Sequence, residues 1–310
     1  MPTAIIVREV GLRDGLQIHP TFMPTADKLA WISAAAAAGI REIEVTSYVP
    51  PKLIPQFTDA AEVTRGALEI PGLKSSALVP NLKGAERGLE LGVPMLNFVV
   101  SVSRTHNLKN VRREPSESVA DFREIVRRVR TESAARRTII SAGLSTALGC
   151  SYEGRIPVDD VVRLAVELAD AGADELMIAD TVGYADPAQV RRVFRAVQQE
   201  VKTVPLRAHF HDTRGTGLAN ASAALDCDIT RFDASLGGLG GCPYAPGASG
   251  NIVLEDLVFM FDSMGLDTGI DIGKLLAVRE QVKAALPDMP MHGALWRAGL
   301  PRHYVSAATR

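Results

Sequence analysis

Two histidines spaced two residues apart are the strongest chemical signal in this sequence. His209 and His211 flank Phe210 at the end of an apolar run that begins at Leu206. Residues i and i+2 of a β-strand share a face, so both imidazoles point to one side and Phe210 points to the other. Imidazoles are common metal ligands. The pattern therefore predicts part of a metal site at the end of a strand.

Oxygen ligands stand near the ends of other predicted elements. Arg13 and Asp14 follow an apolar run, and Asn251 follows a glycine-rich segment. Asp14 would supply a carboxylate oxygen, while the planar guanidinium of Arg13 would orient an oxyanion or carboxylate. Asn251 could instead be the N-cap of the next helix. Imidazoles favour Zn, Mn or Fe, whereas oxygen ligands and water also permit Mg or Mn.

Two more carboxylates belong to apolar strand patterns. Glu44 lies within one, and Asp180 follows another. Buried carboxylates are rare unless they are paired. Glu44 could therefore hold Arg13 in place or act as an acid or base. Asp180 allows a comparable role, and either residue could be purely structural.

A glycine-rich segment carries one thiol. Six glycines lie between residues 237 and 250, together with Cys242. Glycine loses more conformational freedom on folding than any other residue. The density therefore predicts a mobile loop that closes over a ligand and carries Cys242 with it. The alternative is a flexible surface loop with an incidental cysteine.

The elements that must position these residues alternate regularly. Predicted strands and helices follow one another as β then α, which implies parallel strands joined by crossover helices. Eight such units in about 260 residues match the size of a (β/α)8 TIM barrel, an α/β fold, and a doubly wound open sheet is the alternative. The strands are predicted at 5–10, 42–46, 74–79, 95–102, 138–142, 175–179, 206–211 and 231–235, and the helices include 26–38, 57–69, 116–132, 158–171, 187–199 and 217–225.

The chain is predicted to form one domain. No linker divides residues 1–310, and a helix near 272–285 exceeds the eight-unit count. Residues 268–310 are therefore expected to be a C-terminal extension that caps the barrel or meets a second subunit. In a barrel of this kind, functional residues gather at the C-terminal ends of the strands.

Composition indicates which partners the protein is expected to bind and which cellular compartment it is expected to occupy. The net charge is −2 and no basic stripe is visible, which argues against nucleic acid as a partner. The three cysteines are widely spaced, which favours a reducing compartment. No apolar run is long enough to span a bilayer. We therefore expect a cytoplasmic protein with no membrane partner.

Eight motifs together resemble one enzyme family. They lie at residues 9–17, 43–48, 80–84, 147–150, 180–183, 209–213, 237–251 and 255–257. On these motifs the sequence closely resembles the hydroxymethylglutaryl-CoA lyases, which are metal-dependent Claisen-type lyases on (β/α)8 barrels. The resemblance extends from residue 5 to about residue 285. The Cys242 loop is specific to the lyases and is absent from related synthases and aldolases.

The resemblance implies a cofactor and a ligand set. Asp14, His209, His211 and Asn251 would bind Mg2+ or Mn2+. The implied substrate is a CoA thioester, 3-hydroxy-3-methylglutaryl-CoA, which would be cleaved to acetyl-CoA and acetoacetate. The family resemblance also favours a homodimer and a place in leucine degradation and ketone-body formation. The base that takes the hydroxyl proton stays open among Asp14, a metal-bound histidine and a bound water.

The same resemblance implies the catalytic set. Arg13 would bind the substrate and stabilise negative charge on it, and Cys242 would be the catalytic thiol on the loop. His209, Glu44 and Asp180 complete the predicted catalytic residues. Either Cys242 or a site histidine would protonate the enolate product.

Other positions bear on the CoA portion and the acyl group. The basic, amide-rich run 103–113 follows the fourth strand, and Lys109 and Asn110 within it are predicted to bind the CoA phosphates. An ordinary solvated loop is the alternative.

Arg214 stands where many relatives carry tyrosine, which leaves a longer-chain or citramalyl-type thioester open as the substrate. A condensing synthase is less favoured, and a non-catalytic metal-binding barrel is the remote alternative.

Overall fold

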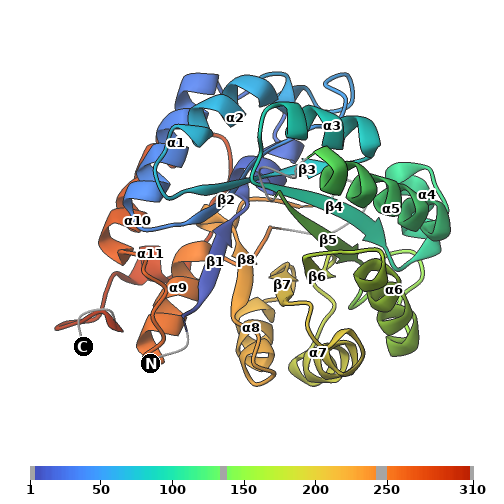
Figure 1. The fold of residues 1–310 in the computed structure, drawn as a ribbon. Helices are drawn as coiled ribbons and strands as arrows, with labels where there is room; N and C mark the ends of the chain where they lie inside the picture. The colour runs from blue at the N-terminus through green and yellow to red at the C-terminus, as the bar shows by residue number, and fades with distance from the viewer. Residues whose placement is uncertain (1–3, 133–137, 242–249, 308–310) are drawn as a thin grey trace.

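The computed structural model describes residues 4–132, 138–241 and 250–307. Within these residues, eight parallel strands form a closed barrel, in which each strand pairs with the next and β8 pairs with β1 (Figure 1). The pairing of β8 with β1 confirms the predicted TIM barrel and excludes an open sheet. The strands are β1 (Ile6–Glu9), β2 (Glu42–Ser47), β3 (Lys74–Val79), β4 (Met95–Ser101), β5 (Ile139–Ser145), β6 (Glu175–Asp180), β7 (Leu206–Phe210) and β8 (Arg231–Ala234).

Helices surround the barrel in the order that a β-then-α chain requires (Figure 1). They are α1 (Thr25–Ala37), α2 (Ala60–Leu68), α3 (Leu82–Glu90), α4 (Arg104–Val111), α5 (Pro115–Glu132), α6 (Val158–Asp170), α7 (Pro187–Val201), α8 (Gly217–Leu225), α9 (Leu254–Ser263), α10 (Ile272–Ala285) and α11 (Ala294–Ala298). No helix in the described ranges combines the length and the apolar composition that crossing a bilayer requires.

Most of the polar run 103–113 is helix α4, so the alternative of an ordinary solvated loop is wrong. Ser103 caps α4, since its Oγ accepts a hydrogen bond from the His106 amide at 3.1 Å. Such a cap satisfies an amide that has no partner inside the helix. Arg112 then ends α4 with a left-handed φ of 58°. The polar composition of this run suggested a loop, whereas its capping serine is the local signal for a helix.

The C-terminal extension takes a place in the helical layer. Helix α10 contacts both α1 and α9. Its start is tied to the end of α1, because the Asp271 amide donates to the Ala38 carbonyl at 2.8 Å. The extension therefore closes the ring of helices between the last barrel helix and the first.

The barrel interior carries charged side chains, whereas the layer between strands and helices is apolar. Arg207 on β7 reaches Glu42 on β2 at 2.5 Å and Glu175 on the neighbouring β6 at 2.9 Å. A contact between β7 and β2 crosses the barrel, so these side chains lie inside it. Removing any one of these three side chains would leave the charge of its partner buried and uncompensated. The three are therefore expected to depend on one another for stability.

Candidate metal centre

A π-helical turn at the end of β1 places the first site residues. Gly11–Gly15 forms this turn, in which the Asp14 amide donates to the Val10 carbonyl at 2.7 Å. A side chain at Gly11 would collide with a buried ring, because a Cβ there would lie 2.9 Å from Cη2 of the fully buried Trp31. Single π-helical turns are frequent at functional sites. This turn carries Arg13 and Asp14 on consecutive residues.

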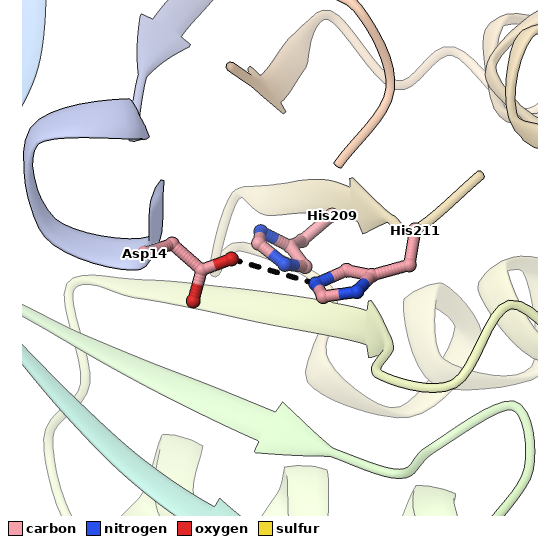
Figure 2. Close-up of side chains that lie close together, drawn as sticks. All are labelled: Asp14, His209 and His211. Atoms are coloured by element: carbon pink, nitrogen blue, oxygen red, sulfur yellow. Dashed lines mark ion pairs between the residues drawn. The ribbon is translucent and has the colours of Figure 1, made fainter. Parts of the chain in front are cut away.

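Asp14 and the two predicted histidines converge. The ligand atoms of Asp14, His209 and His211 all lie within 4.8 Å of one another, and all three residues are buried. Figure 2 shows Asp14 pointing toward His211, whose Nε2 is 3.5 Å from Asp14 Oδ2. The imidazole centroids are 5.2 Å apart. Phe210 is fully buried and packs against Phe194 of α7, as the strand alternation predicts.

Backbone pairing brings Asn251 to the same place. Asn251 and His211 form an isolated antiparallel bridge. Asn251 Nδ2 donates to Asp14 Oδ2 at 2.6 Å and to the Leu239 carbonyl at 3.0 Å. The next helix begins only at Leu254, so the interpretation of Asn251 as an N-cap was wrong.

The donor set fits a divalent metal ion. Asn251 Oδ1 is buried and has no hydrogen-bond partner among the described residues. A buried polar atom without a partner is costly, and an ion at this position would remove that cost. One carboxylate, two imidazoles and one amide oxygen are a suitable ligand set for a divalent ion. Asp14, His209 and His211 can therefore hold a metal ion, and Asn251 can complete the set.

Arg13 links this group to the barrel interior. Its Nη1 donates to Asp14 Oδ1 at 2.6 Å, and its Nε donates to Glu44 Oε2 at 2.5 Å. Burial alone would raise the pKa of Asp14, but Arg13 and the two nearby imidazoles hold it well below its usual range. Glu44 thus makes the contact with Arg13 that the sequence analysis considered for it.

Asp180 and Arg214 both shape the loop after β6. The Asp180 carboxylate accepts hydrogen bonds from the Tyr184 amide at 2.9 Å and the Ala185 amide at 3.0 Å. Burial raises the pKa of Asp180. Arg214 donates to the carbonyl of Gly183 at 3.1 Å and lies over the Tyr184 ring at 4.4 Å. The guanidinium of Arg214 therefore binds to this loop.

The described part of the glycine-rich segment is tightly packed against the site. Left-handed φ values occur at Gly237, Gly238, Gly240 and Gly241. A Cβ on Gly240 would lie 2.4 Å from Asn251 Nδ2, and one on Gly250 would lie 1.6 Å from the Gly238 carbonyl oxygen. At these positions glycine is explained by backbone conformation and close approach, a reason that the mobile-loop interpretation overlooked.

The remaining predicted site residues are Lys109, Asn110 and Cys242. Lys109 and Asn110 lie on α4, and Lys109 Nζ is 4.9 Å from the centre of the Tyr152 ring. Helix α4 follows β4, so both residues belong to the end of the barrel that carries the metal ligands. Cys242 lies outside the described residues, and its role stays a prediction.

Asp233 is a site residue that the sequence interpretation missed. Its Oδ2 lies 3.2 Å from His209 Nδ1, and the two residues are register partners on β8 and β7. A signal was present, since Asp233 stands between the apolar Phe232 and Ala234 within a predicted strand. The alternation argument that singled out His209 applies equally to this carboxylate.

Comparisons with known proteins agree with this geometry. The chain is 42% identical to the hydroxymethylglutaryl-CoA lyase YngG of Bacillus subtilis over 291 residues, which cover 93% of this chain and 96% of that protein. It is 37% identical to the mitochondrial hydroxymethylglutaryl-CoA lyase of Mus musculus, covering 92% and 87% of the two chains. An HMG-CoA lyase from Acinetobacter baumannii, solved with coenzyme A and 3-methylmalate, superimposes with a TM-score of 0.91 at 40% identity and covers 97% of each chain. Residues 4–282 match the HMGL-like family model, and the chain therefore belongs to the HMGL-like family.

Proposed function

We propose that this protein is a carbon–carbon lyase that cleaves 3-hydroxy-3-methylglutaryl-CoA into acetyl-CoA and acetoacetate. The observation that carries the proposal is the convergence of Asp14, His209 and His211, with Arg13 beside them. The similar lyases named above support the hydroxymethylglutaryl group over a citramalyl-type group.

The proposed cofactor is Mg2+ or Mn2+, held by Asp14, His209, His211 and Asn251. When bound, a divalent ion would stabilise negative charge on the substrate's 3-hydroxyl oxygen as its proton passes to the base, a histidine of the site or a bound water. The low pKa of Asp14 suits a ligand that stays ionised, and it makes this carboxylate a poor proton acceptor.

Arg13 is proposed to bind the thioester oxygen. Cleavage of the C2–C3 bond leaves its electron pair on C2, as the enolate of acetyl-CoA, while C3 becomes the ketone carbon of acetoacetate. A preorganised cation beside the enolate oxygen stabilises that charge as it forms. Glu44 already fixes the guanidinium through Nε, so little reorganisation is needed when the substrate arrives.

Cys242 is proposed to protonate C2 of the enolate and so release acetyl-CoA. Its position in the glycine-rich segment, next to Gly241, supports this role, because Gly240 lies against Asn251 and Asp14. General acid catalysis of this kind contributes on the order of 100- to 10,000-fold to the rate.

Lys109 and Asn110 are proposed to contact the phosphates of CoA.

The oligomeric state, the cellular compartment, the domain organisation and the metabolic role are also part of the proposal. We infer a homodimer in the cytoplasm, in which 1–310 is one catalytic domain with 268–310 as its extension. The product acetoacetate would make the enzyme a contributor to leucine degradation and ketone-body formation.

The test is a cleavage assay on the purified protein. It is given 3-hydroxy-3-methylglutaryl-CoA with Mg2+, with Mn2+ or with excess chelator, and acetoacetate and acetyl-CoA are followed. We expect fast cleavage that the chelator abolishes, and we expect Cys242→Ala to lose turnover while still binding substrate. Cleavage that chelator leaves intact would refute the metal's role, and no cleavage under any condition would refute the substrate.

A further inference from the structure

We propose that Asp233, Arg8 and Asn97 are positioning residues that fix His209 and Arg13 from inside the barrel. None of the three was singled out by the sequence, and each acts through another side chain rather than on the substrate. This proposal rests on the proposed function, because it assigns the residues that orient a metal ligand and the substrate-binding guanidinium.

The first contacts follow from strand register. Asp233 on β8 is the register partner of His209 on β7 and of Arg8 on β1. Arg8 Nε donates to Asp233 Oδ1 at 2.9 Å, and Arg8 Nη2 donates to Oδ2 at 2.8 Å. This two-bond pairing fixes the plane of the carboxylate. Asp233 Oδ2 then lies 3.2 Å from His209 Nδ1.

The pairing has a chemical consequence for His209. A carboxylate accepts the Nδ1 proton, so the other ring nitrogen, Nε2, keeps its lone pair for a metal ion. A hydrogen bond of this kind sets both the tautomer and the orientation of a metal-ligating histidine. Asp233 therefore decides which nitrogen of His209 is offered to the site.

The next contacts cross the barrel. Arg8 Nη1 donates to Asn97 Oδ1 on β4 at 3.1 Å. Asn97 Nδ2 donates to Glu44 Oε1 at 2.6 Å, and Glu44 Oε2 accepts from Arg13 Nε at 2.5 Å. One continuous hydrogen-bond chain therefore joins His209 to Arg13. We call Asp233, Arg8, Asn97 and Glu44 the interior chain.

The chemistry of Asn97 suits its place in the interior chain. Its neighbours are a guanidinium, which can only donate, and a carboxylate, which can only accept. An amide satisfies both, because it accepts at Oδ1 and donates at Nδ2. Aspartate could not donate to Glu44, and leucine could do neither. Asn97 is 5% exposed and Arg8 is 2% exposed, so water is a poor substitute for either contact.

Two variants separate the two ends of the interior chain. Asp233→Asn removes the charge at His209 and is expected to weaken Mn2+ binding by about 10- to 100-fold, which is the usual cost of losing such a partner. Asn97→Asp keeps an acceptor for Arg8 but opposes Glu44, so it disturbs Arg13. We expect its kcat to fall at least tenfold while the Kd for Mn2+ changes less than threefold.

The control is Ser76→Ala. Ser76 Oγ accepts a second hydrogen bond from Asn97 Nδ2 at 3.2 Å, yet Ser76 is outside the interior chain. Its Mn2+ Kd and kcat are expected to stay within twofold of the parent protein. If Asn97→Asp does not fold, Asn97→Leu replaces it, with the same expected split between kcat and Kd.

Mn2+ affinity is measured by titration calorimetry on the substrate-free protein, and kcat is measured at saturating Mn2+. A merely structural role would lower the melting temperature and leave both quantities as in Ser76→Ala, which would overturn the proposal. If the parent protein binds Mn2+ but does not cleave the thioester, the proposed function fails. The interior chain is then judged on Mn2+ affinity, and a parent-like Kd in Asp233→Asn would overturn it.

Discussion

His211 and Asn251 face each other across an isolated antiparallel bridge, although they lie far apart in the sequence. The adjoining backbone supports this bridge, because the Ile252 amide donates to the Phe210 carbonyl at 3.1 Å and the Asp212 amide donates to the Gly250 carbonyl at 3.0 Å. The segment that re-enters the barrel after the glycine-rich run is therefore fixed to the end of β7. The site consequently gains an amide oxygen that no barrel strand supplies.

Asn251→Ala is expected to raise the Kd for Mn2+ at least tenfold, because it removes a buried oxygen donor from the ligand set. Titration calorimetry on the substrate-free protein checks this. Asn220→Ala is the matched control, since Asn220 on α8 is also buried with an Oδ1 that lacks a partner within the described residues. Equal Mn2+ affinities in the two variants would remove Asn251 from the ligand set.

Gly240→Ala is expected to weaken Mn2+ binding at least tenfold by displacing Asn251, because the new Cβ would lie 2.4 Å from Asn251 Nδ2. Gly215→Ala is the control. Gly215 also has a left-handed φ, 72°, but nothing lies within 4 Å of its Cβ position. The control should lose only about 1 kcal/mol of stability from backbone strain, with Mn2+ affinity unchanged. A Gly240→Ala variant with parent-like affinity would show that the close approach does not matter.

Arg13→Lys is expected to lower kcat by about 100-fold or more, since an ammonium cannot reproduce the fork that contacts Glu44 and Asp14 together. The Kd for Mn2+ should change much less. Arg191→Lys is the control, because Arg191 makes a two-nitrogen contact with Asp226 on the exposed helical layer. A kcat ratio near one between the two variants would argue against a catalytic role for Arg13.

His106 is expected to make stability depend on pH. Burial lowers the pKa of His106 to about 4, below the unfolded value of about 6.5. Between these values the unfolded chain binds more protons than the folded one, so stability falls as the pH falls. At pH 5 the loss relative to pH 8 is about 2 kcal/mol.

Urea unfolding of the parent protein and of His106→Gln at pH 8 and pH 5 measures this contribution. The parent should lose about 2 kcal/mol more than the variant over this interval. Other titrating groups contribute equally to both proteins and cancel in the comparison. Identical losses would mean that His106 is protonated as easily in the folded state as in the unfolded chain.

Much of this protein was predictable from local sequence. Short apolar runs located the strands within a few residues, and repeated β-then-α order indicated the closed barrel. The spacing of His209 and His211 was sufficient to predict that both imidazoles face one way, because strand geometry has a period of two. Asp14 was identifiable because the C-terminal ends of parallel strands meet at one end of a barrel.

Tertiary structure alone decided which polar groups meet inside the barrel. Whether Glu44 touches Arg13, whether Asp233 reaches His209, and how Arg8 contacts Asn97 all depend on register and on closure between β8 and β1. Asn251 could not be distinguished from a helix cap by local rules, because its identity as a site residue comes from a bridge to a distant strand. Local periodicity reports which face a residue occupies, whereas only the closed barrel determines what lies opposite it.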